Sequence, residues 1–168
     1  MAASTAIWDA VWATSNELLA ESAEHTRRAI ILLTDGDDTI SQVKMHEAIE
    51  RAQKADALIY AVGIGDRYSF GVNEGALRKI TDQTGGRAYF PRNERELREA
   101  FAQIQRDLRE RYLLAYSPTN KARDGSYRKI QIEIVNPELQ KELKLTYRQG
   151  YFAKPAESST PRPATRQP

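Results

Sequence analysis

Apolar and polar positions alternate in two different ways along this chain, and the pattern changes near residue 111. Before that point, stretches with an apolar residue at every third or fourth position are separated by continuous apolar runs of strand length. The runs at 27–34 and 57–64 predict strands covered on both faces of a sheet. A shorter strand is expected at 87–90. The periodic stretches predict amphipathic helices at 6–20, 42–55 and 73–84, and a fourth beginning at Asn93.

The expected helix ends and buried faces follow from the same stretches. We expect Ser4 or Thr5 to cap the first helix. Asn73 should cap the third helix, which Gly85 and Gly86 end. Asn93 should cap the fourth, with Glu96 as its capping-box partner. The residues expected to face the core are Ile7, Val11, Thr14 and Leu18 in the first helix, Met45, Ile49 and Ala52 in the second, and Leu97, Phe101, Ile104 and Leu108 in the fourth.

After residue 111 the apolar period becomes two, and no helix is expected between the apolar stretches. Strands are predicted in "RYLLAYS" (111–117), "YRKIQIEIV" (127–135), "LKLTY" (143–147) and "GYF" (150–152). Because period-two strands without helical crossovers pair antiparallel, this segment predicts a small antiparallel sheet. The stretch from Pro155 onward holds four of the seven prolines among Ser, Thr and Arg, a composition that predicts disorder.

The predicted fold class is therefore α/β: a parallel sheet flanked by helices, followed by an antiparallel β extension. We expect an α/β unit over residues 1–110, the extension over 111–154 packed on it, and a disordered Pro-rich tail over 155–168. The 25 basic and 23 acidic residues give a net charge of +2, which does not indicate binding to nucleic acid. No apolar run is long enough to span a membrane. The N-terminus lacks a signal-peptide pattern, and cysteine is absent.

In the segment "AIILLTDGDD", a predicted buried strand is followed at once by three aspartates, Asp35, Asp37 and Asp38. In an open α/β sheet, ligands bind at the carboxyl ends of strands, and carboxylate oxygens there suit Mg²⁺ or Mn²⁺. The alternative is a loop whose aspartates form turns and cap helices. A phospho-acceptor aspartate would require a lysine at the end of the second strand, and "AVGIGDR" has none. Neither phosphate-binding glycine motif is present.

Several segments in this order resemble von Willebrand factor A (VWA) domains: "STAIWDAV", "IILLTDGDD", "YAVGIG", "LRKITDQTGGRAYF" and "ERELREAFAQI". The appended "YLLAYSPTN", "SYRKIQIEIV" and "LTYRQGYFAKP" resemble VWA-related proteins of acidobacteria and similar bacteria. The resemblance covers residues 4–154. It implies a Rossmann-like α/β fold and a role in binding a protein or matrix ligand. It also implies an extracytoplasmic location.

In VWA domains a metal-ion-dependent adhesion site is assembled from three loops. Thr5 matches the threonine of the second loop, and Asp35 matches the aspartate of the third. The D-x-S-x-S of the first loop is absent, so the chain resembles the C-terminal two-thirds of such a domain. Thr5 and Asp35 supply one neutral and one charged ligand, and we expect Mg²⁺ or Mn²⁺ to bind weakly or not at all. In the family site, an acidic side chain of the partner completes the metal's shell.

We expect a non-catalytic binding domain, with Asp37, Asp38, Tyr68 and Phe70 as partner contacts at the same end of the sheet. The alternatives are a scaffold domain with a vestigial, metal-free site and, third, a metal-assisted hydrolase, for which no general base stands out. Because the strand at 27–34 would normally lie beside the absent central strand, self-association through an open sheet edge is also expected.

Overall fold

A computed structural model describes residues 4–19, 26–34, 38–65 and 73–155 of the chain. The remaining residues include Asp35, Asp37, Tyr68 and Phe70, so the expectations for these four side chains lie outside the described residues. The disorder expected after residue 155 also falls there, on 156–168. No helix of the described part is long and apolar enough to cross a membrane.

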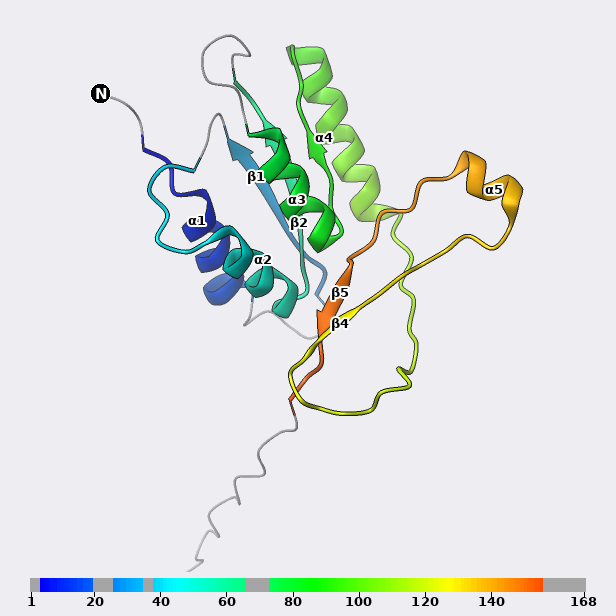
Figure 1. Ribbon diagram of the computed structural model, residues 1–168. Helices are drawn as coiled ribbons and strands as arrows, with labels where there is room; N and C mark the ends of the chain where they lie inside the picture. Colours follow the sequence, from blue (N-terminus) through cyan, green and yellow to red (C-terminus); the bar gives the residue numbers. More distant parts are fainter. Residues whose placement is uncertain (1–3, 20–25, 35–37, 66–72, 156–168) are drawn as a thin grey trace, which may run out of the picture.

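The sheet of the α/β unit is parallel, as the sequence predicts (Figure 1). Its strands are β1 (Arg28–Thr34), β2 (Ala57–Gly63) and β3 (Ala88–Tyr89), in that spatial order. β1 pairs with β2 along its whole length, from Arg28 opposite Ala57 to Thr34 opposite Gly63. β1 and β2 therefore end at the same edge of the sheet, where their arrowheads lie in Figure 1.

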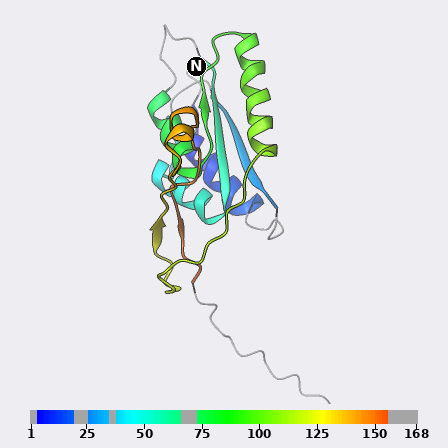
Figure 2. The same ribbon diagram turned by 90° about the vertical axis from the view of Figure 1, so that its right-hand side faces the viewer.

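Helices cover both faces of this sheet. One face carries α1 (Ile7–Ala13) with the π-helical turn η1 (Thr14–Leu18), α2 (Met45–Lys54) and α3 (Glu74–Thr84). The opposite face carries α4 (Glu94–Arg109), which stands apart from α2 and α3 in Figure 2. These layers confirm the predicted Rossmann-like arrangement of helix, parallel sheet and helix.

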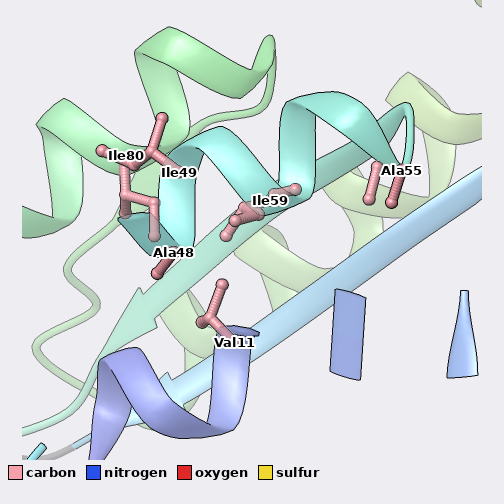
Figure 3. Packing of buried hydrophobic residues seen from close by; sticks show 8 residues of the cluster. Val11, Ala48, Ile49, Ala55, Ile59 and Ile80 are labelled. Atoms are coloured by element: carbon pink, nitrogen blue, oxygen red, sulfur yellow. The ribbon is translucent and has the colours of Figure 1, made fainter. Parts of the chain in front are cut away.

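The larger hydrophobic core lies between α1, α2 and the sheet (Figure 3). Val11 of α1, Ile49 of α2 and Ile59 of β2 meet there, and each is less than 4% exposed. Small residues of α2, Ala48 and Ala52, allow the helix to lie close to the sheet. A second cluster joins Tyr60 and Val62 of β2 to Ile104 of α4.

The caps of α3 and α4 agree with the sequence prediction. Asn73 accepts a hydrogen bond from the N–H of Ala76 at 3.1 Å, and Asn93 accepts one from the N–H of Glu96 at 2.9 Å. Gly85 ends α3 in the left-handed conformation with φ of 81°. At the start of α1 the prediction was wrong. Neither Ser4 nor Thr5 is the N-cap residue; Ala6 is, and its side chain makes no capping hydrogen bond.

Two predictions about buried faces were also wrong. β1 is not covered on both sides, because Ile31 is 46% exposed and Leu33 is 57% exposed. On α4, Leu97, Ile104 and Leu108 pack against the second cluster as predicted, but Phe101 is 41% exposed. Ile31 and Leu33 belong to β1, which has a neighbouring strand on one side only among the described residues.

The extension is antiparallel, as predicted, but its paired region is short. β4 (Tyr127–Lys129) pairs with β5 (Gly150–Phe152), and a short helix, α5 (Pro137–Glu142), lies between them along the chain. The strands predicted at 111–117 and 143–147 are absent from the ladder. Because neither segment pairs with another strand among the described residues, their alternating apolar side chains stay largely exposed. Tyr112, for example, is 94% exposed.

The extension contacts the α/β unit at the turn that follows α2 and at the end of α3. Lys54 Nζ lies 5.0 Å above the ring centre of Phe152, and Arg148 pairs with Asp56. Arg111 Nη2 donates to the carbonyl of Gly85 at 2.8 Å. These contacts are far from the carboxyl edge where β1 and β2 end (Figure 1).

Candidate functional site

The candidate site is the carboxyl edge of the sheet, where the segment before α1 meets the loop after β1. Thr5 lies two residues before the start of α1, and the described part of the loop begins at Asp38. The N–H of Ile64 donates to the carbonyl of Thr34 at 2.8 Å, so the chain after β2 leaves from this edge as well. Ligands of open α/β sheets bind at such an edge.

Backbone hydrogen bonds hold Thr5 against the loop. Its N–H donates to Oγ1 of Thr39 at 2.8 Å, and its carbonyl accepts from the N–H groups of Thr39 at 2.9 Å and Ile40 at 3.3 Å. The Thr5 hydroxyl makes no hydrogen bond to another described residue. The backbone of Thr5 is therefore fixed against the loop.

Asp38 caps α1 from a distance of 31 positions in the chain. Its Oδ1 accepts from the N–H of Ile7 at 2.6 Å and from the N–H of Trp8 at 3.4 Å. A carboxylate at a helix N-terminus satisfies donors that the helix itself leaves unpaired and interacts favourably with the helix dipole. Asp38 thus takes the capping role that the sequence assigned to Ser4 or Thr5.

Ser41 completes the cap. Its hydroxyl donates to Oδ1 of Asp38, and its oxygen lies within hydrogen-bond distance of the N–H groups of Trp8, at 3.1 Å, and Asp9, at 3.2 Å. Asp38 and Ser41 together bind the first three N–H groups of α1. Sequence reasoning missed this role of Ser41. The signal was the D-x-x-S spacing, which resembles a capping motif but serves a helix elsewhere in the chain.

Asp9 of α1 in turn accepts hydrogen bonds from backbone N–H groups of the loop. Its Oδ1 accepts from the N–H of Val43 at 2.8 Å, and its Oδ2 accepts from the N–H of Gln42 at 3.1 Å. We call this reciprocal set of bonds, made by Thr5, Asp9, Thr39, Asp38 and Ser41, the edge clasp. It joins two segments more than 30 residues apart into one surface at the carboxyl edge.

The described residues do not by themselves fit a tight metal site. They contain no group of three or more His, Asp or Glu side chains arranged to hold a metal ion. Oδ1 of Asp38 is already engaged in capping, which leaves the Thr5 hydroxyl as the one sequence-predicted ligand whose position is described. Mg²⁺ requires six oxygen ligands in near-octahedral geometry, so one neutral oxygen cannot hold it.

Comparison with known proteins bears on this site. The sequence model of the von Willebrand factor type A domain matches residues 1–103, the span that contains β1, β2 and the edge clasp. A search of curated proteins returned no match.

Among solved structures, the chain is similar to one titled "Crystal Structure of Uncharacterized Membrane Spanning Protein from Vibrio fischeri". The identity is 36%, the match covers 52% of this chain and 50% of the other, and the TM-score is 0.44. The match thus spans about half the length of that structure's chain.

Proposed function

This chain belongs to the von Willebrand factor type A domain family, and from that premise we propose that it is a non-catalytic binding domain for a protein or matrix ligand. Domains of this family generally serve protein interaction or adhesion. The proposed binding surface is the carboxyl edge of the sheet, formed by the segment around Thr5 and the loop that runs from Asp35 to Ser41.

The edge clasp is the observation that carries this proposal. A ligand surface built from two distant segments needs those segments fixed relative to each other before binding, because ordering them at the moment of binding would lower the affinity. The hydrogen bonds that the Ile7 N–H donates to Asp38 and the Val43 N–H donates to Asp9 supply that fixation. A single helix cap would secure α1 alone, whereas bonds in both directions also secure the loop.

The proposed metal site is incomplete without the ligand. Thr5 and Asp35 would offer one hydroxyl and one carboxylate to Mg²⁺ or Mn²⁺, and we expect dissociation constants no tighter than about 0.1–1 mM, as for weakly charged oxygen sites. An acidic side chain of the ligand would add charge to this incomplete set. Asp37, Asp38, Tyr68 and Phe70 remain proposed contacts for the ligand. For Asp38, the contact would fall to Oδ2, because Oδ1 caps α1.

Two other functions use the same edge. A scaffold domain with a vestigial site would bind its partner without metal, and the capping role of Asp38 is compatible with that. A metal-assisted hydrolase is the third candidate; it would require a general base within reach of a metal-bound water.

Binding to a panel of immobilised matrix proteins, in Mn²⁺ and in EDTA, distinguishes these functions. We expect binding that EDTA and Asp35→Ala each weaken at least tenfold. The control Glu138→Ala changes an exposed carboxylate of α5 and should bind like the natural chain. Binding that survives both EDTA and Asp35→Ala would establish the scaffold instead. Metal-dependent turnover of a generic phosphoester or peptide, abolished by Asp35→Ala, would establish the hydrolase.

Self-association through the outer edge of β1 is a separate proposal, because it would leave the carboxyl edge of the sheet free.

A further inference from the structure

β3 ends the sheet on the side away from β1, and part of its backbone points outward. The N–H of Ala61 donates to the carbonyl of Arg87 at 3.1 Å, so Arg87 and Tyr89, two residues on, direct their backbone groups toward β2. The N–H and C=O groups of Ala88 and the N–H of Phe90 therefore point away from β2. Within the described residues these three groups make no hydrogen bond, so they are open to pairing with a further strand.

A shallow cavity of about 480 Å³ lies beside this edge, between β3 and α4, which stand next to each other in Figure 2. Tyr89 lines it from β3, on the face that carries α4, because it stands opposite Val62 and packs against the cluster beneath that helix. Pro91 continues this apolar side, and Ala100 lines the cavity from α4. The volume falls in the range of roughly 300–1,000 Å³ that is usual for ligand sites.

The two sides of the cavity are held in place without a ligand. The hydroxyl of Tyr89 lies 3.5 Å from Oδ2 of Asp107 on α4, and Oδ1 of Asp107 accepts from Nε2 of Gln103 at 2.7 Å. On the other face of β3, the guanidinium of Arg78 lies 4.8 Å from the ring centre of Phe90. A surface that is ordered beforehand loses little affinity to ordering when a ligand binds.

Two opposite charges, Glu99 and Arg106, line the cavity from α4. Ile104 packs against the two residues of β2 that flank the partner of Ala88, so it lies level with Ala88. α4 follows β3 and runs back antiparallel to it (Figure 1). At about 1.5 Å per residue, Arg106 then lies about 3 Å toward the start of β3, and Glu99 lies about 7.5 Å toward its end. The cavity is therefore negative near the end of β3 and positive near its start.

We call the outer edge of β3 together with this cavity the β3 groove. We propose that the β3 groove binds an extended peptide segment of a partner protein, added antiparallel to β3, whose side chains at positions i, i+2 and i+4 are basic, apolar and acidic. The groove lies on the flank of the sheet, so this inference does not depend on the ligand proposed for the carboxyl edge.

The backbone sets the register of the peptide. In an antiparallel pair, Ala88 exchanges both of its outward hydrogen bonds with one peptide residue, and an antiparallel edge strand on a parallel sheet is common. The two neighbours of that peptide residue face α4. One is the apolar residue i+2, opposite Tyr89, and the other is the acidic residue i+4, opposite Arg87. The basic residue i then stands opposite Pro91.

The charges of the groove select the sequence in this register. The basic residue lies at the end of β3 near Glu99, and the acidic residue lies at its start near Arg106. Positions i and i+4 of a strand are about 13 Å apart, and the seven helix residues from Glu99 to Arg106 span about 10 Å. Long side chains accommodate the difference. Because β3 offers only three outward backbone groups, these side-chain contacts decide which sequence binds.

Fluorescence anisotropy with a labelled peptide, "TKVLTET", tests the proposal. The natural chain should bind it about fivefold or more tightly than "TEVLTKT", in which the two charges are exchanged, as expected for two surface ion pairs. N-methylation of the fifth peptide residue, which removes the N–H donated to the carbonyl of Ala88, should weaken binding about tenfold, as expected for a lost backbone bond. Absence of binding at about 1 mM peptide, the limit of weak affinity, or equal affinity for both sequences, would overturn the proposal.

Exchanging the charges of the protein completes the test. The double variant Glu99→Lys and Arg106→Glu should reverse the preference and bind "TEVLTKT" more tightly, an outcome that unfolding cannot produce. The matched control, Glu138→Lys with Lys141→Glu, exchanges an exposed pair on α5 and should keep the natural preference.

EDTA separates this groove from the carboxyl edge. Binding of "TKVLTET" should be the same in EDTA and in Asp35→Ala, because neither changes the β3 groove. Binding that either treatment abolishes would place the peptide at the carboxyl edge instead and would overturn the proposal. So would a natural preference that survives the exchange of Glu99 and Arg106. A chain that elutes as a dimer until the peptide is added would show that a second copy, and not a partner protein, occupies the groove.

Discussion

The carboxylate of Asp38 accepts a hydrogen bond from the N–H of Ile7 at 2.6 Å, and in return the carboxylate of Asp9 accepts one from the N–H of Val43 at 2.8 Å. Each of the two segments, α1 before the strand β1 and the loop after β1, thereby supplies a carboxylate that accepts hydrogen bonds from the backbone of the other. This exchange explains why an apolar strand leads into a group of aspartates: at least one of them is needed to begin a helix elsewhere in the fold.

The capping role of Asp38 predicts different effects from two substitutions. Asp38→Ala should lower the free energy of unfolding by about 1 kcal/mol, because the first N–H groups of α1 lose their acceptor. Asp38→Asn should cost much less, since asparagine is as good a cap as aspartate. Urea unfolding of the three proteins measures the difference. Equal losses in both variants would mean that the negative charge, and not the cap, is what matters at this position.

The reciprocal bonds predict that Asp9 and Asp38 act together. Either Asp9→Ala or Asp38→Ala alone should loosen the contact between α1 and the loop. The second substitution should then cost less than it does in the natural chain, with a coupling energy of about 0.5–1 kcal/mol. A double-mutant cycle by urea unfolding gives this energy. Strict additivity would show that the two carboxylates stabilise independent parts of the molecule.

Two glycines near α3 should respond to alanine in opposite directions. A Cβ at Gly86 would overlap the carbonyl of Ile59 in β2, so Gly86→Ala should destabilise the protein by about 1–3 kcal/mol or more. A Cβ at Gly75 would meet nothing closer than 3.7 Å. Gly75→Ala should therefore be neutral or stabilise α3 by up to about 1 kcal/mol, through the lower entropy of its unfolded chain. Thermal melting of the two variants, compared with the natural protein, tests both signs.

Tyr60 predicts a loss of stability at high pH. Burial in the cluster beneath α4 raises the pKa of its phenol above the usual 10.0. A raised pKa in the folded state contributes stability below the unfolded pKa, and that stability is lost as the pH rises through the folded value. Tyr60→Phe should remove part of the decline in unfolding free energy above about pH 10. Tyr112→Phe, at an exposed position, should retain it. Identical declines in both variants would mean that the pKa of Tyr60 is the same in the folded and the unfolded protein.

Local sequence signals predicted the elements that depend on local interactions. Asn73 and Asn93 cap helices only three residues away, so their spacing is visible in the sequence. The cap of α1 was missed because its acceptor comes from Asp38, after an intervening strand. α5 was also missed, although Asn136 followed by Pro137 is a recognisable start: Asn136 accepts from the N–H of Glu138 at 2.9 Å.

The apolar pattern predicted which side chains would be stabilised by burial. It did not predict whether another helix or strand lies close enough to cover them. Ile30 and Leu32 pack under α1 and α2, whereas Ile31 and Leu33 have the same apolar character and remain exposed. The difference arises from the arrangement of elements, since α4 lies over β2 and leaves the β1 edge open. The same limit explains the extension, where the alternating segment at 111–117 has no strand to pair with.

Manganese titration followed by NMR tests the site most directly, because bound Mn²⁺ broadens the signals of nearby amides. At about 1 mM Mn²⁺, the range expected of a weak oxygen site, we predict selective broadening of the amides of Thr5, Thr39 and Ile40 in the natural chain. Asp35→Ala should lose this broadening, while Glu138→Ala should keep it. Broadening that is absent from the carboxyl edge, or that survives Asp35→Ala unchanged, would contradict the proposed ligand site.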